Sequence, residues 1–191
     1  MGFFIYAPQV QRAKIAVRAA FIANGFTAGS LIARLPDFKI LLDASTSQMG
    51  QFLFCISAGI LFSLTFIGKI IAKQGSKPIA IFGSIITALV LIPVAFSTSA
   101  LPIAISFFFF GICITVQDVA MNSHAATLEH KTDRKLMSGF HALFSVGALT
   151  GGLFGGLCSQ FDFSIRNQSL FLSVMFLITA TNFRNFWLPS E

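Results

Sequence analysis

The sequence predicts an all-α polytopic membrane protein, and its composition and apolar runs carry that prediction. Hydrophobic residues make up 55% of the 191 residues, and charged residues make up only 10%. A soluble domain of this length needs a polar surface that such a composition cannot supply. The long uncharged runs lack the period-2 alternation of a transmembrane β-barrel. Backbone that faces lipid must therefore satisfy its hydrogen bonds within helices.

Six segments are apolar enough to cross a bilayer, which takes about 20 residues each. The uncharged run 78–117 is long enough for two crossings, and we expect the polar cluster 97–99 with Pro102 to divide it into a hairpin. The predicted helices cover 13–35, 47–71, 77–96, 101–128, 135–159 and 166–188. We expect them to form a single six-helix transmembrane domain over residues 1–191.

Basic residues gather on one side of these spans. Ten lie before the first helix, in alternate connections or after the last helix: Arg12, Lys14, Arg18, Lys69, Lys73, Lys77, Lys131, Arg134, Lys135 and Arg184. Three lie on the other side: Arg34, Lys39 and Arg166. The positive-inside rule then predicts that both termini are cytoplasmic. The net charge of +6 thus reflects membrane topology, and we expect no nucleic-acid partner.

One acid, Asp118, lies inside an apolar helix. A charge at the centre of a span costs about 2.5–3.5 kcal/mol on insertion, so such residues usually face a cavity or a partner. Asn122 lies four residues later on the same face. His141 lies early in the next helix, about six residues after its start, and its depth in the membrane differs from that of Asp118 by about 6 Å at 1.5 Å per residue. We predict a substrate and proton pathway here; the alternative is a static polar cluster that fixes helix packing.

Small and polar residues mark the remaining candidates. Asn24 lies near the middle of the first helix, where it either faces an aqueous cavity or bonds a neighbouring helix. Gly147, Gly151 and Gly155 recur every four residues in the fifth helix, a spacing typical of close helix packing. The third helix of each three-helix half carries fewer polar residues than the first two. This weak internal symmetry is expected of a 3+3 inverted repeat.

Other polar residues have simpler interpretations. We interpret Arg34 as a charge that snorkels to the membrane interface. His124 and His130 are expected at the interface as well. Three scattered histidines do not predict a metal site, and we expect no metal and no cofactor. An intramembrane hydrolase is disfavoured because no GxSG occurs, and we expect no enzyme.

Three stretches carry a family resemblance: ARLPDF after the first helix, QDVAMNSHAATLEH at the fourth and GFHALFSVGALTGGLFGG at the fifth. From about 14 to 188, the chain resembles the N-terminal half of a major facilitator superfamily transporter. More narrowly, it resembles the fucose-permease-like branch of bacterial inner-membrane permeases. The connection between the second and third predicted helices reads GKIIAKQGSK. It is similar to the superfamily's Gly-rich signature at Gly68, Lys73, Gly75 and Lys77. It departs at Ala72, where the signature usually has an acid.

The resemblance implies a secondary active transporter, or the N-terminal half of one, in the cell inner membrane. It would move a small polar solute, with proton coupling left open. Asp118 falls where related sugar–proton symporters carry a carboxylate, but their companion acid in the first helix has no counterpart here. Alternating access then requires a second six-helix half, from a longer gene product, a separate chain or a homodimer. The alternative is a truncated fragment in the lipid that transports nothing.

Overall fold

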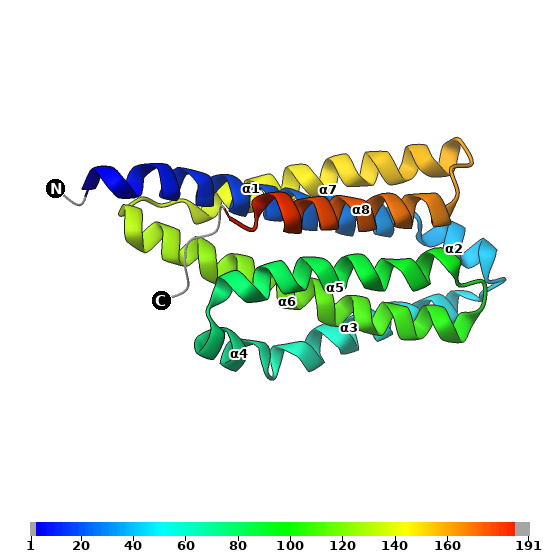
Figure 1. The fold of residues 1–191 in the computed structure, drawn as a ribbon. Helices are drawn as coiled ribbons and strands as arrows, with labels where there is room; N and C mark the ends of the chain where they lie inside the picture. The colour runs from blue at the N-terminus through cyan, green and yellow to red at the C-terminus, as the bar shows by residue number, and fades with distance from the viewer. Residues whose placement is uncertain (1–2, 186–191) are drawn as a thin grey trace.

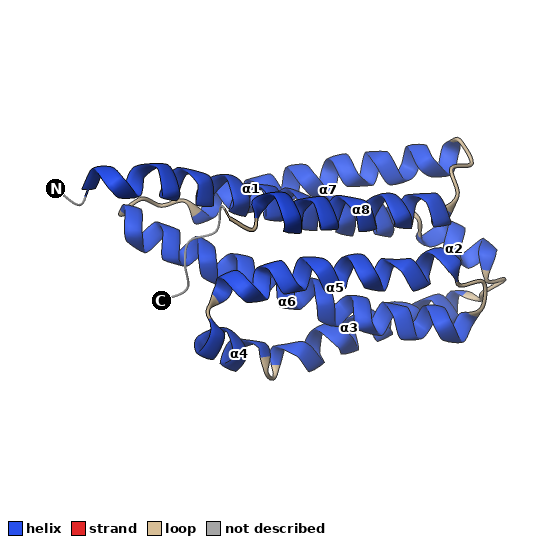
Figure 2. Ribbon diagram, viewed as in Figure 1, coloured by secondary structure: helices blue, strands red, loops and turns tan. Residues whose placement is uncertain are grey.

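The structure is a computed structural model that describes residues 3–185, without the side chains of 3–7 and 183. In this range the chain forms eight α-helices and no strand (Figure 2). The long helices are α1 (Phe3–Ala33), α3 (Thr46–Leu64), α5 (Ser76–Phe96), α6 (Ala100–Thr132), α7 (Met137–Gln160) and α8 (Ile165–Phe183). The short ones are α2 (Leu35–Leu41) and α4 (Ile67–Gln74).

The long helices run alongside one another, with α2 and α4 at opposite ends (Figure 1). Of the described helices, five are long and apolar enough to cross a membrane: α1, α3, α5, α6 and α7. The predicted span 166–188 corresponds to α8, which does not meet that criterion within the described residues. Its first two turns carry Arg166, Asn167, Gln168 and Ser169, and these polar side chains lower its hydropathy.

Helix boundaries differ from the sequence predictions at three places. The first helix begins ten residues earlier than predicted, at Phe3, and ends at Ala33. Pro36 then occupies the first turn of α2, a separate short helix that the sequence reading did not foresee. The predicted helix 47–71 is divided at 65–66 into α3 and α4. The division turns α4, which carries lysines, away from the axis of the preceding apolar span.

Helices α1 and α7 approach each other with almost no side chain between them. A Cβ at Gly25 would overlap the carbonyl oxygen of Phe144, and a Cβ at Gly151 would overlap that of Phe26. Gly29, Gly147 and Gly155 meet the partner backbone in the same way. Because lipid tails are as apolar as leucine, such close van der Waals packing is what holds helices together in a membrane.

A second pair, α3 and α6, packs in the same manner. A Cβ at Gly59 would overlap the Phe108 carbonyl oxygen, and a Cβ at Gly111 would overlap the Ile56 carbonyl oxygen. Helix α5 lies between α6 and α8, and the Ser173 hydroxyl of α8 donates to the carbonyl of Ala88 in α5 at 2.7 Å. Helix α1 also contacts α6 and α8, so that the six long helices form one bundle.

The connection between α6 and α7 is held by Glu129. Its Oε1 accepts hydrogen bonds from the backbone N–H groups of Leu136 (2.6 Å) and Met137 (3.0 Å). The start of α7 therefore lies level with Glu129, one turn back from the end of α6. Asp133 ends α6 in the left-handed conformation, at φ 49°, which aspartate tolerates better than most residues.

Replacing Gly151 with alanine tests the α1–α7 contact, and Gly156 on the same helix is the matched control. A Cβ at Gly151 meets backbone atoms of Phe26, whereas a Cβ at Gly156 meets nothing within 4 Å. We expect Gly151→Ala to lower the free energy of unfolding by about 1–3 kcal/mol, because the added methyl group overpacks the helix contact. Gly156→Ala should leave the free energy of unfolding unchanged, or raise it by up to about 1 kcal/mol through higher helix propensity. Thermal unfolding in detergent measures both, and equal midpoints would contradict the close contact.

Candidate functional site

Asp118 lies near the middle of α6, and its side chain is half-buried. Asn122, one turn later, donates from Nδ2 to the Asp118 carbonyl oxygen at 2.9 Å and to Oδ1 at 3.3 Å. The Thr115 hydroxyl on the same face donates to the carbonyl of Gly111 at 2.8 Å. Asp118 and Asn122 therefore form a local pair on a face that the bundle does not fully cover.

His141 is exposed on α7 and stands edge-on to the ring of Phe21 in α1, with centroids 5.4 Å apart. The hydrogen bond between Glu129 and Met137 places these two residues at the same height in the bundle. Asp118 is eleven residues from that height along α6 (129 − 118), and His141 is four residues from it along α7 (141 − 137). At 1.5 Å per residue their heights differ by about 10 Å, more than the 6 Å expected.

Asn24 lies inside the bundle, where its side chain is 3% exposed. Its Nδ2 is buried and has no hydrogen-bond partner among the described residues, and the same is true of Thr27 Oγ1. Ser30 lies about one turn after Thr27 in α1. Gln168 of α8 donates from Nε2 to Ser30 Oγ at 2.6 Å and to the Ser30 carbonyl at 3.1 Å. Asn24 thus belongs to a buried polar seam between α1 and its neighbours.

Helices α5 and α8 contain several buried polar side chains, contrary to the sequence interpretation that these two helices carry little polarity. In α8, Gln168 and Ser169 are buried as well as Ser173. In α5, the buried Ser84 accepts a hydrogen bond from Gln117 Nε2 of α6 at 3.0 Å. The signal that could have revealed this was the run of polar residues at 166–169, which lies at the start of an otherwise apolar helix.

Arg34 does not snorkel to the interface, so that interpretation is wrong. The residue is 4% exposed and forms an ion pair with Asp37 in α2. It also donates from Nη1 to the Phe163 carbonyl at 2.8 Å. The Ser159 hydroxyl completes the cluster by donating to Asp37 Oδ1 at 2.9 Å. Together these bonds tie the α1–α2 turn to the connection between α7 and α8.

His124 is also buried, at 2% exposed, although the sequence suggested an interfacial position. Its Nδ1 lies 2.9 Å from the hydroxyl of Ser76, at the start of α5. In the GKIIAKQGSK connection, Gly75 ends α4 at φ 81°, a conformation that suits glycine. Gly68 and Lys73 are exposed on α4, and Lys77 lies half-buried in the first turn of α5.

The described part of the chain holds no group of three His, Cys, Asp or Glu side chains that could bind a metal ion. Cys55, Cys113 and Cys158 are free thiols.

Comparison with known families identifies the fold. The family model of the Major Facilitator Superfamily matches residues 18–191. The chain belongs to the Major Facilitator Superfamily. Superfamily membership confirms the resemblance seen in the sequence and points to a membrane transporter rather than an enzyme. The fucose-permease-like branch stays a prediction.

Several curated proteins are similar to the chain. An uncharacterized transporter of Sinorhizobium fredii is 30% identical over 171 residues, which cover 86% of this chain and 42% of that protein. An uncharacterized MFS-type transporter of Yersinia pestis is 29% identical over 72% of this chain and 36% of its own length. The proton-coupled antiporter flippase LtaA of Staphylococcus haemolyticus is 25% identical over 90% of this chain and 44% of its length. The chain thus spans less than half of each relative.

The Arg34 cluster predicts a large effect of Arg34→Ala. Removing one partner of a buried ion pair costs about 3–5 kcal/mol, and we expect the low end because the Asp37 side chain is 22% exposed. Arg166→Ala is the matched control: its exposed guanidinium lies 4.8 Å from the Phe96 ring centroid, a contact worth about 0.5–1 kcal/mol. Thermal unfolding of both variants measures the two effects. A larger loss of stability in Arg166→Ala than in Arg34→Ala would contradict the buried cluster.

Proposed function

We propose that the chain is the N-terminal six-helix half of a secondary active transporter that moves a small polar solute. The observation that carries the proposal is the half-buried Asp118–Asn122 pair, near the middle of a membrane-spanning helix in a member of a transporter superfamily. A carboxylate at that depth is expensive unless it meets water, a solute or a proton. The pair is therefore our candidate substrate and proton site, and we assign His141, about 10 Å nearer the α6–α7 connection, and Asn24 of α1 to the same pathway.

We propose further that α8 is the sixth span and that the helices form a 3+3 inverted repeat. In such a repeat α1 corresponds to α6, α3 to α7 and α5 to α8. The α1–α7 pair of helices then corresponds to the α6–α3 pair. Both pairs pack through glycine against carbonyl oxygen, at Gly25 and Gly151 in one and at Gly59 and Gly111 in the other. The α5–α8 pair corresponds to itself. This matched packing supports the repeat.

The distribution of basic residues supports an orientation with both termini in the cytoplasm. The start of α1, the helix α4 and the end of α6 lie at the same end of the bundle (Figure 1). Together with the residues that directly follow α4 and α6, these three regions hold nine of the 13 lysines and arginines, as the positive-inside rule expects of the cytoplasmic side. We propose the cell inner membrane as its location because the chain is similar to transporters of the bacteria Yersinia pestis and Sinorhizobium fredii.

A second half would complete the transport route. The relatives are more than twice as long as the part that this chain matches. Helices α3 and α7 leave large apolar side chains exposed, including Leu61 and Phe62 on α3 and Leu149 and Leu153 on α7. Lipid covers part of this surface, and we propose that a second six-helix half covers the rest. The alternative is a fragment that folds in the membrane but moves no solute.

Proton coupling through Asp118 is the finer hypothesis. The Staphylococcus haemolyticus relative is described as a proton-coupled antiporter, which makes the hypothesis worth testing here. Within residues 3–185, Asp118 is the one carboxylate inside a candidate span, since Asp37, Asp43, Glu129, Asp133 and Asp162 lie at helix ends or in turns. A mechanism that needs two intramembrane acids is therefore not supported for this half.

Asp118→Asn tests the proposal. The chain is reconstituted in liposomes that contain a pH-sensitive dye, with and without a co-expressed downstream half. A panel of sugars, organic acids and amino acids is then applied with an inward pH gradient. We expect a solute-dependent proton flux that falls at least tenfold in Asp118→Asn, because the amide cannot release a proton. Asp162→Asn, an exposed acid in the α7–α8 connection, is the control and should keep the flux.

The outcomes separate the alternatives. Flux that survives in Asp118→Asn removes the protonation role. Flux that appears only with the downstream half shows that this chain is one half of the transporter. Radiolabelled uptake without proton movement would indicate uniport, and no uptake in either preparation would favour the non-transporting fragment.

A further inference from the structure

Helix α4 is amphipathic, and its two faces differ sharply. Ile67 and Ile71 are buried, at 2% and 9% exposed, and pack into the core cluster that also holds Ile79 and Ala80 of α5. Lys69 and Lys73 lie four residues apart on the opposite face, and both are exposed. A helix of this kind holds itself in place through its apolar face and presents its charges outward.

The charged face has no acid of its own. Residues 67–78 contain Lys69, Lys73 and Lys77 but no aspartate or glutamate, and Ala72 lies between the two exposed lysines. Among the described residues, no acid forms an ion pair with any of the three lysines. Glu129, in the last turn of the neighbouring α6, already accepts two backbone hydrogen bonds from the start of α7. The positive charge is therefore not balanced within this part of the bundle.

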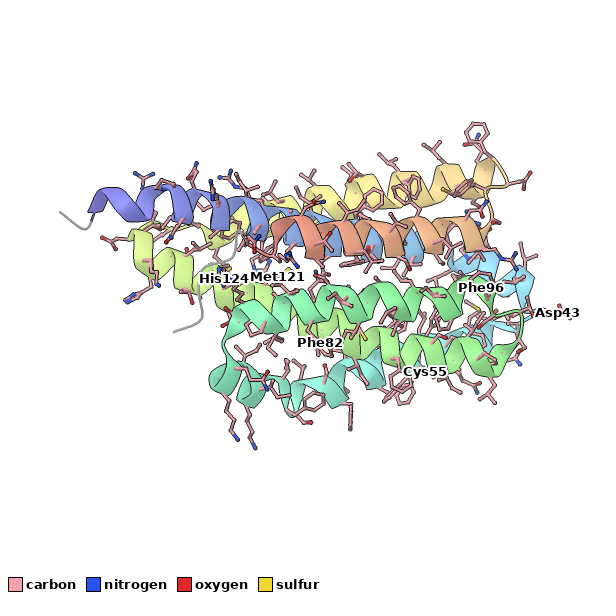
Figure 3. All side chains as sticks on the ribbon, in the orientation of Figure 1. Asp43, Cys55, Phe82, Phe96, Met121 and His124 are labelled. Carbon is pink, nitrogen blue, oxygen red and sulfur yellow. The ribbon has the colours of Figure 1, made fainter. Side chains whose placement is uncertain are left out.

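Further positive charge lies close by. Lys77 lies in the first turn of α5, directly after α4, and Lys131 lies in the last turn of the neighbouring α6. Side chains that end in nitrogen extend from α4 away from the other helices (Figure 3). Because α4 connects the candidate spans α3 and α5, we expect this charge at the membrane surface, at the height of the lipid headgroups.

We propose that the lysine face of α4, made of Lys69 and Lys73 and extended by Lys77, binds the phosphate headgroups of anionic phospholipid in the adjoining leaflet. Basic residues next to a span attract anionic lipid, and their effect falls off within a Debye length of the surface. An amphipathic helix with lysines on its polar face is suited to such an interface. The proposal does not depend on transport, since it concerns a surface remote from Asp118.

The test uses the full chain in nanodiscs of phosphatidylcholine with increasing phosphatidylglycerol. Native mass spectrometry counts the phosphatidylglycerol molecules retained by each chain after release. Lys69→Gln/Lys73→Gln should weaken retention roughly 30-fold, as expected for the loss of two surface lysines. Arg134→Gln/Lys135→Gln is the matched control: it removes the same charge from exposed positions at the same end, beside Glu129 and Asp133. The control should change retention less than threefold.

Two further arms sharpen the result. Lys69→Arg/Lys73→Arg keeps the charge and should keep the lipid. Potassium phosphate should compete no better than potassium chloride of equal ionic strength, because the site belongs to a lipid at the surface. Equal losses in the two Gln double variants, equal retention of phosphatidylcholine, or specific competition by phosphate would each overturn the proposal. Circular dichroism confirms that the exposed substitutions leave the helices intact.

Discussion

The rest of the structure depends on the direct approach of one helix backbone to another at glycine. In lipid there is no hydrophobic force between helices, so association relies on van der Waals contact and a few hydrogen bonds. Gly25 and Gly151 allow α1 and α7 to meet at this distance, and Gly59 and Gly111 do the same for α3 and α6. This packing holds α7 against α1 and α6 against α3, and the contacts of α1 with α6 then bring the two pairs together.

Polar residues act as a second layer of constraint within this frame. Gln168 bonds α8 to Ser30 of α1, and Gln117 bonds α6 to Ser84 of α5. At the end of the bundle that holds α2, Arg34 and Asp37 hold the α1–α2 turn against the α7–α8 connection. Each of these polar groups is costly in an apolar interior unless it finds a partner, so each favours one arrangement of its helices.

The pattern of predictions that succeeded has a physical reason. The Asp118–Asn122 pair follows from the helical repeat alone, because residues four apart must share a face. The burial of Arg34 could not be foreseen, because its hydrogen-bond acceptor, the Phe163 carbonyl, lies 129 residues away in the chain. The height of His141 was misjudged mainly because α7 begins at Met137 rather than at 135, which leaves His141 four residues into the helix instead of six. Local periodicity predicts faces, whereas long-range hydrogen bonds decide which faces meet.

The sequence by itself determined that the chain is helical and membrane-embedded, where most spans begin and end, and that Asp118 is the acid within a span. Those properties depend on hydropathy and on the helical repeat, which are local. Only the tertiary structure decided that α4 turns away from α3, that Asn24 and His124 are buried, and that the glycines of α7 face α1. Such features arise from contacts between segments far apart in the chain, and no single segment encodes them.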